Sequence, residues 1–244
     1  MDLWASELAK HFGLLESTEI YDDIQAMGHD FSTNRIDAAV LTASEYFTME
    51  KQFHGTLGFA RLSAGKKTEK LVVLARVDKG YTDISALRNK RLAYVKYDEL
   101  SMIYMNYLLL KKMLPAADKY FADMQAKRKP INLIHAVYFD QADICVTTQR
   151  AFRQACEMNP QIGEKLKIIS LSPELVGGLA IFRGGYDGIN RRKVIEAINR
   201  FDEYPRSRQV MTMLQMEGVA ALTEEDLTET RNFFREYFRL MKRK

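Results

Sequence analysis

The chain has 244 residues, of which 47% are hydrophobic and 28% charged, the composition of a globular protein with a core. The length suits one large domain or two lobes of roughly 100 residues each. The net charge of +4 comes from 36 basic and 32 acidic residues, an excess too small to indicate a nucleic-acid-binding surface. No stretch approaches the ~20 apolar residues that span a bilayer, and the opening residues lack the pattern of an export signal.

The two cysteines, Cys145 and Cys156, have no metal-site spacing and form no disulfide framework. We expect two buried free thiols, because Cys145 lies in an apolar run and Cys156 in a helix-like run. A bridge between them would require the strand that carries Cys145 to pack beside the following helix. The sequence predicts no metal site and no cofactor.

The first half of the chain alternates between helical and extended patterns. Leu3, Trp4, Leu8 and Phe12 share one helical face before Gly13, so we expect the chain as given to begin inside a helix. We expect a strand at 18–21, a helical turn at 22–27, a strand at 36–42, a helix at 44–50 capped by Ser44, and strands at 55–62 and 70–77.

The second half repeats this alternation and ends in helices. The segment 78–95 predicts a short helix, a basic turn and a strand at 91–95. We then expect helices at 101–113, 116–127 and 131–138, a strand at 142–147, a helix at 149–157, strands at 166–171 and 178–183, and only helices from Asn190 onward.

Short strands interleaved with helices indicate α/β architecture with a largely parallel sheet in each lobe. We expect lobe one to comprise residues 1–80 and 177–244 and lobe two residues 84–174, with two hinge crossovers near 74–84 and 172–180. In open α/β sheets ligands bind beyond the carboxyl ends of the strands, so the predicted ligand site lies between the lobes.

Several segments resemble a known family. Residues 87–95 (LRNKRLAYV) resemble the entry into the second lobe of type 2 periplasmic binding proteins. Residues 134–152 (IHAVYFDQADICVTTQRAF) are similar to a stretch of phosphate-, phosphite- and phosphonate-type ABC transporter substrate-binding proteins. The similarity continues through 158–169 and 172–178, and residues 35–46 resemble the family's first-lobe strand and loop.

The resemblance implies a two-lobed type 2 periplasmic-binding-protein fold and a monomeric solute-binding receptor rather than an enzyme. The ligand would be a small molecule such as a phosphonate- or phosphate-like anion, and the partner an ABC permease or a membrane sensor. A periplasmic or extracytoplasmic location is implied, while the missing export signal leaves a cytoplasmic one open. Two alternatives remain: a ligand-sensing regulatory domain for a signalling partner and, less favoured, a cofactor-precursor enzyme on the same fold.

Three features depart from the family pattern. The loop after the second-lobe strand reads KYDELS (96–101) instead of a cradle of small hydroxyl residues, and Asp98 and Glu99 would repel an anion unless Lys96 offsets them. Thr147 and Thr148 stand where phosphonate binders often carry an acidic residue that holds a ligand amine. The family's first strand would precede the helix with which this sequence starts.

Candidate ligand-binding residues follow the predicted strands, where backbone amides at helix starts face a ligand. In lobe one they are Thr42, Ser44, Glu45 and Tyr46. The structural alternatives are capping by the hydroxyls and packing by Tyr46.

In lobe two the candidates lie on three segments. For Ser101 and Asp98 the alternative to ligand binding is a helix cap. We expect His135 in the N-terminal part of a short helix, and the alternative for it is a surface position without a ligand role. Asp37 and Asp143 we interpret as structural residues that fix the turns into strands. The second-lobe candidates are Lys96, Tyr97, Glu99, Ser101, His135, Thr147 and Thr148.

Overall fold

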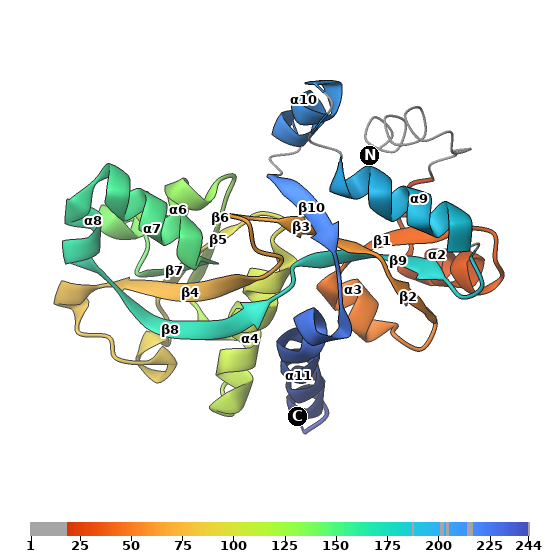
Figure 1. Cartoon of the computed structure of the whole chain (residues 1–244). Coiled ribbons are helices and arrows are strands. Elements are labelled where there is room, and N and C mark those ends of the chain that lie inside the picture. The colour runs from red at the N-terminus through yellow and green to blue at the C-terminus, as the bar shows by residue number, and fades with distance from the viewer. Residues whose placement is uncertain (1–18, 187, 201–202, 204, 214–216, 244) are drawn as a thin grey trace. The chain divides into compact units, whose positions relative to one another are not determined.

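The computed structural model describes residues 19–186, 188–200, 203, 205–213 and 217–243 (Figure 1). Its described part forms two compact units. Unit 1 comprises the residues up to Thr68 and Val176–Thr228, and unit 2 comprises Glu69–Leu175 and the residues from Glu229. The predicted helix at 3–12, and with it the question of a missing first strand, lies outside the described residues.

Unit 1 is built on antiparallel pairs of strands. β9 (Gly178–Arg183) lies between β1 (Ala38–Thr42) and β2 (Gly55–Leu57) and is antiparallel to both. A Cβ atom at Gly55 would lie 2.2 Å from the carbonyl oxygen of Phe182, so only glycine fits there. A second pair joins β3 (Phe59–Leu62) to β10 (Gly218–Ala221).

The helices of unit 1 come from both of its chain segments. A side-chain oxygen of Asp23 accepts a hydrogen bond from the amide of Gln25 and caps the first of them. The helices are α2 (Ile24–Ser32), α3 (Ala43–Thr48), α9 (Gly188–Asn199) and α10 (Pro205–Met213).

Unit 2 contains a five-stranded mixed sheet in the order β6-β5-β7-β4-β8. β5 is parallel to β6 and β7, whereas β4 is antiparallel to β7 and β8. The strands are β4 (Glu69–Arg76), β5 (Arg91–Val95), β6 (Asp123–Lys127), β7 (Ile144–Thr148) and β8 (Leu166–Leu175).

The helices of unit 2 cover both faces of its sheet, with α6, α7 and α8 on one side and α4 on the other (Figure 1). α11 (Glu224–Met241) begins in unit 1 and continues into unit 2. The remaining helical elements are η1 (Val77–Lys79), η2 (Ile84–Leu87), α4 (Glu99–Lys111), α5 (Ala117–Tyr120), α6 (Pro130–Tyr138), α7 (Gln149–Met158) and α8 (Pro160–Lys165).

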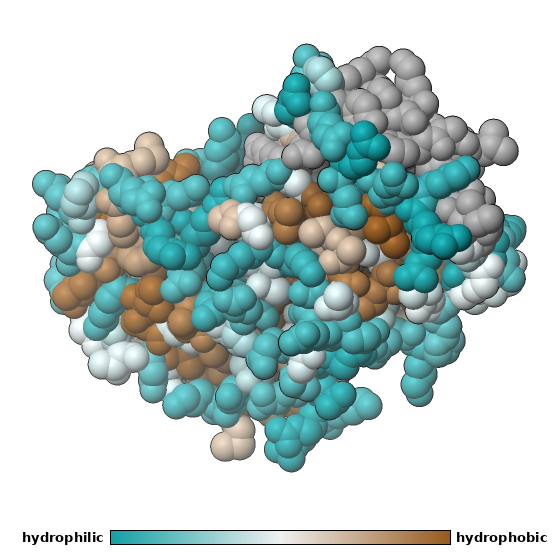
Figure 2. All heavy atoms as spheres, viewed as in Figure 1, coloured by the Kyte–Doolittle hydropathy of each residue, from teal (hydrophilic) through white to brown (hydrophobic). Residues whose placement is uncertain are grey.

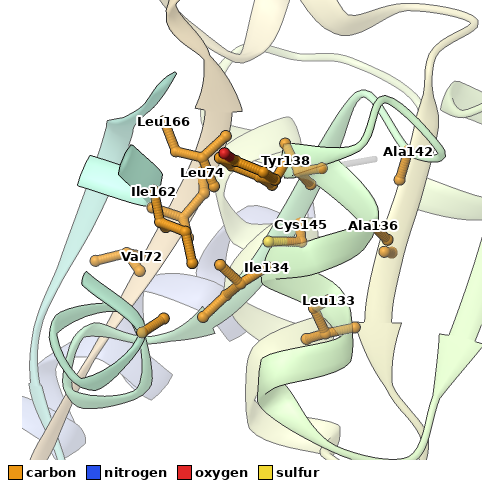
Figure 3. Packing of buried hydrophobic residues seen from close by; sticks show 13 residues of the cluster. Val72, Leu74, Leu133, Ile134, Ala136, Tyr138, Ala142, Cys145, Ile162 and Leu166 are labelled. Atoms are coloured by element: carbon orange, nitrogen blue, oxygen red, sulfur yellow. The ribbon is translucent and has the colours of Figure 1, made fainter. Parts of the chain in front are cut away.

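The core of unit 2 explains why β4 and β7, two inner strands of its sheet, are apolar along nearly their whole length. Val72, Leu74 and Cys145 on the strands pack against side chains such as Ile134 of α6 and Ile162 of α8 (Figure 3). Each fully buried side chain of this kind stabilises the fold by about 1.5–3 kcal/mol. This core fixes where the strands of unit 2 end, and therefore where the following loops lie.

On the face seen in Figure 2 hydrophilic residues predominate, and hydrophobic residues gather in patches. Two exposed hydrophobic residues, Ile168 and Leu171, lie on the edge strand β8. Of the helices that the structure describes, none combines the length and apolar character needed to cross a bilayer.

The α/β class is confirmed, and the strands expected at 91–95 and 178–183 have the predicted bounds. The expectation of a largely parallel sheet in each lobe is wrong for the described strands. In unit 1, β9 inserts between β1 and β2 in the opposite direction to both. In unit 2, two of the four strand pairings are antiparallel. The first crossover was expected near 74–84, but the boundary lies between Thr68 and Glu69, since β4 pairs with the strands of unit 2.

Three further predictions are wrong. Residues 19–21 form no strand. The helix expected at 116–127 is the short α5 followed by β6, because Asp123–Lys127 pairs in parallel with β5. The C-terminal part is not wholly helical, because β10 pairs with β3.

Candidate functional site

The parallel strands of unit 2 bring three loops to one edge of the sheet. Because β5, β6 and β7 run in the same direction, the segments at their carboxyl ends, 96–98, 127–129 and 147–150, share that edge. The amide of Lys96 donates to the carbonyl oxygen of Lys127 at 2.9 Å. Ala93 is paired with Cys145, which places Val95 level with Thr147. We call these three segments the carboxyl edge.

The carboxyl edge is rich in positive charge. Lys96, Arg128 and Lys129 are exposed, and Lys127 and Arg150 are half-buried. α6 and α7 both begin at this edge, and neither has an acidic residue in its first turn. Since a helix N-terminus carries partial positive charge, the lysines, arginines and helix starts together favour an anion here.

The negative groups at the same edge are largely engaged. Asp98 accepts hydrogen bonds from the amide of Ser101 at 3.2 Å and from its hydroxyl, and so caps α4. Lys70 at the start of β4 lies 4.0 Å from Glu174 on β8. Glu99, in the first turn of α4, is exposed and also has a partner.

The loop 96–98 is a tight turn with an unusual residue at its tip. The amide of Asp98 donates to the carbonyl oxygen of Val95 at 3.1 Å, and Tyr97 has φ +70°. This geometry is that of a type II turn, whose third position favours glycine. The side chain of Tyr97 is 90% exposed, and the ammonium of Lys96 lies 4.8 Å from its ring centroid.

Two neighbouring threonines in the loop 147–150 differ in their hydrogen bonding. Thr148 accepts from the amide of Ala151 at 3.1 Å and caps α7. Thr147 is 1% exposed, and its hydroxyl has no hydrogen-bond partner. Leaving a buried hydroxyl without a hydrogen bond costs about 1–3 kcal/mol, so most buried polar groups have a partner. The Thr147 hydroxyl is an exception to this rule.

The predicted first-lobe residues form a capping box. Thr42 accepts from the amide of Glu45 at 3.2 Å, and the Glu45 carboxylate accepts from the amide of Thr42 at 2.7 Å. The N-cap of α3 is therefore Thr42. The prediction that Ser44 caps this helix is wrong. Ser44 lies 3.1 Å from the Thr42 hydroxyl, and Tyr46 is buried edge-to-face against Phe47.

His135 lies away from the carboxyl edge. It occupies the last turn of α6, not the N-terminal part of the helix, and its exposed ring is 6.0 Å from that of Phe139. At 1.5 Å per residue, it stands about 7 Å along the helix from Pro130.

Unit 2 thus brings together Lys96, Tyr97, Thr147 and Thr148, with Glu99 and Ser101 in the adjoining first turn of α4. The basic run 127–129 and Arg150 were not among the predicted site residues. The run was missed because a helix was expected at 116–127, where β6 ends instead. Three consecutive basic residues before Pro130, a residue typical of a first helical turn, were the available signal.

The amino edge of the same sheet holds structural ion pairs. Asp143 accepts from the amide of Arg91 at 2.8 Å and from its guanidinium Nε at 3.0 Å. Burial raises the pKa of Asp143, but these hydrogen bonds outweigh it and lower the pKa below its ordinary value. In unit 1, Asp37 accepts from the guanidinium Nε of Arg183 at 2.6 Å, so each aspartate is paired with an arginine, which agrees with the structural role expected for both.

The described residues include no cluster suited to a metal ion, and neither cysteine forms a disulfide. The described part of the chain contains no group of three or more histidine, cysteine or carboxylate side chains placed to hold a metal ion. Cys145 and Cys156 are free thiols, the first buried and the second half-buried. Burial raises the pKa of Cys145 far above its ordinary value, so it is a poor nucleophile.

Comparison with known proteins gives a family match over most of the chain. The model for the periplasmic substrate-binding protein of phosphonate ABC transporters matches residues 1–227. No curated protein matches the sequence.

Solved structures share the fold at low sequence identity. A Xanthomonas citri protein, XAC2383, bound to ATP is 14% identical, with a TM-score of 0.67 over 99% of this chain and 92% of that chain. PhnD1 from Prochlorococcus marinus in complex with methylphosphonate is 15% identical, with a TM-score of 0.63 over 96% and 90%. A binding protein of a Pseudomonas aeruginosa ABC phosphonate transporter is 15% identical, with a TM-score of 0.61 over 98% and 81%. These likenesses confirm the type 2 periplasmic-binding-protein fold.

Proposed function

We propose that this chain, which belongs to the family of periplasmic substrate-binding proteins of phosphonate ABC transporters, captures a small phosphorus oxyanion for uptake through an ABC-type permease. Family membership makes the chain a solute-binding receptor rather than an enzyme and implies an extracytoplasmic location. The identity of the ligand and the partnership with a permease are what we propose.

The observation that carries the proposal is the charge of the carboxyl edge. Within the part of the chain that the structure describes, Lys127, Arg128 and Lys129 form no ion pair, so their charges are available. A unit charge 4 Å from a phosphonate oxygen contributes about 1 kcal/mol in water and more where water is excluded. The first-turn amides of α6 and α7 add donors with the same preference.

The named ligands of two structural neighbours support the same chemistry. One was solved with methylphosphonate and the other with ATP, and both ligands carry phosphorus oxyanions. That the ligand is enclosed between two lobes remains a prediction, as does the monomeric state.

Thermal unfolding of the whole chain tests the ligand class. We expect phosphate, phosphite and methylphosphonate to raise the melting temperature, because a ligand that binds only the folded state stabilises it by mass action. Choline and neutral sugars should cause no shift. A shift with a cation or a neutral solute, and none with any phosphorus oxyanion, would overturn the assignment.

A pair of double variants tests the location. Arg128→Gln with Lys129→Gln should weaken methylphosphonate binding, whereas Lys90→Gln with Lys119→Gln, which removes the same charge before β5 and β6, should have little effect. Equal losses in the two variants would show that only the overall charge matters. Permease and ATPase genes beside this gene would support transport, and a kinase or cyclase module would support the sensing alternative.

A further inference from the structure

The start of α7 differs from the other helix starts at the carboxyl edge. α4 begins with Asp98 and Glu99, and α6 begins with a proline that has no amide hydrogen. α7 has ten residues, no acidic residue in its first turn and a neutral cap, Thr148. Its first-turn amides therefore favour an acceptor group that carries negative charge.

The unpaired hydroxyl of Thr147 is an independent indication of a ligand group at the same place. In a strand alternate side chains share a face, so Thr147 lies on the face of Cys145, which packs against α6 and α7. Its Oγ1 atom is buried without a partner directly before the Thr148 cap. A hydroxyl donates one hydrogen bond and accepts others, and here it is placed to donate to an incoming oxygen.

The charge around this hydroxyl is positive. Arg150 lies in the first turn of α7 and is half-buried. Thr148, Gln149 and Arg150, the residues that follow Thr147, are all half-buried, so this part of the chain reaches the surface. An ammonium group at this position would meet a helix N-terminus and a guanidinium, both of which disfavour it.

This position is one strand away from the loop 96–98. Val95 is level with Thr147 on adjacent strands, which are spaced about 5 Å apart. A phosphorus oxyanion at the loop 96–98 and a second group at the start of α7 would therefore belong to one small molecule with a short linker.

We infer that the start of α7 binds a second acidic group of the ligand, so that the preferred solutes are organophosphonates or phosphate esters that also carry a carboxylate. The inference rests on the proposed function, because it places the phosphorus group at the carboxyl edge. Thr147 donates its hydroxyl hydrogen to the carboxylate, α7 supplies amide donors, and Arg150 supplies charge.

Calorimetric titration of the whole chain with a matched ligand series tests the inference. Ethylphosphonate, 2-aminoethylphosphonate, phosphonoacetate and 3-phosphonopropionate share the phosphonate and differ in the second group. We expect one of the carboxylated ligands to bind about tenfold more tightly than ethylphosphonate, the gain from one charge-assisted hydrogen bond. The ammonium ligand should bind more weakly than ethylphosphonate.

Substitutions at the start of α7 locate the effect. Thr147→Val and Arg150→Gln should each reduce the ratio of the carboxylated ligand's affinity to the ethylphosphonate affinity, with both ligands measured on the same variant. Arg153→Gln, one turn further along the same helix and exposed, is the matched control and should preserve the advantage.

The outcomes separate the two proposals. If none of the four ligands binds, the proposed function fails. If ethylphosphonate binds but a carboxylate adds nothing, or if 2-aminoethylphosphonate binds most tightly, the inference about α7 is wrong while the proposed function stands. An advantage that persists in Thr147→Val and in Arg150→Gln would also overturn it.

Discussion

At the scale of single residues, hydrogen bonding separates structural from available hydroxyls. Ser101 donates to Asp98, and Thr42 and Thr148 accept from helix amides, so all three contribute to helix starts. Thr147 has no such role. Thr147 and Thr148 are adjacent residues of the same type. They differ in function because only Thr148 faces a helix amide that needs an acceptor.

The two threonines should respond oppositely to the same substitution. Thr147→Val replaces an unpaired buried hydroxyl by a methyl group of similar size, so we expect the free energy of unfolding to stay constant or rise. Thr148→Val removes the cap of α7 and should cost about 1 kcal/mol. Urea unfolding measures both, and a clear loss of stability in Thr147→Val would show that its hydroxyl has a partner in solution.

The backbone conformation of Tyr97 leads to a second prediction at the scale of single residues. Its left-handed backbone costs about 1–2 kcal/mol for a side chain other than glycine, so Tyr97→Gly should raise stability by up to about 1 kcal/mol after the added entropy of the unfolded chain. Met113, with φ +56° and 93% exposure, follows α4 and is the matched control.

The ligand distinguishes these two glycine substitutions. If Tyr97 contacts ligand at the carboxyl edge, Tyr97→Gly weakens methylphosphonate binding while Met113→Gly leaves it unchanged. Equal affinity in both variants would remove Tyr97 from the site.

Part of the candidate site could be predicted from sequence for a definite physical reason. A hydroxyl residue between a strand and a helix has a local signature, which is why Thr42, Ser101 and Thr148 could be assigned to helix starts or ligand contacts. The basic run at Lys127 has no local signature of a site. Its role depends on the parallel pairing of β6 with β5, which is a contact between distant segments.

At the scale of elements, the two strands that the sequence did not predict, β6 and β10, share one cause. β6 and β10 are short strands composed mainly of polar or small residues. They are extended because a neighbouring strand supplies their hydrogen bonds. β4 and β7, by contrast, contain apolar runs that are buried on both faces, and their strand character is visible in the sequence.

The packing of α11 on unit 2 predicts a loss of stability in alkali. Phe233 of α11 lies against Tyr104 and Tyr107, the Tyr107 hydroxyl donates to Glu236 at 2.6 Å, and the Tyr104 hydroxyl lies 2.8 Å from that of Ser170. Burial, opposed by the hydrogen bond with Ser170, raises the pKa of Tyr104 to about 12. Burial, then Glu236, raises the pKa of Tyr107 further.

The direction of this pH effect on stability follows from the number of protons bound by the folded and unfolded states. Between the ordinary tyrosine pKa of about 10 and the raised values, the folded state holds protons that the unfolded state has lost, so stability falls as pH rises. Below pH 10 the contribution is fully present. Urea midpoints at pH 9 to 12 should fall more steeply for the wild type than for Tyr104→Phe with Tyr107→Phe, and equal slopes would contradict the assignment.

At the scale of the whole molecule, the arrangement of charge matters more than its sum. The net charge of +4 is small for 244 residues, yet five basic residues meet at the carboxyl edge. This arrangement arises because three parallel strands end together and each is followed by a basic loop.

The clustered charge predicts how salt affects binding. Exposed charges are screened over about 10 Å at 0.1 M ionic strength, so raising sodium chloride from low to physiological concentration should weaken methylphosphonate binding. The slope of affinity against salt should be shallower in Arg128→Gln with Lys129→Gln and unchanged in Lys90→Gln with Lys119→Gln. If both double variants flatten the slope equally, the whole-molecule charge attracts the ligand. If neither does, neutral hydrogen-bond donors hold the anion and the lysines and arginines of the carboxyl edge are solvated surface.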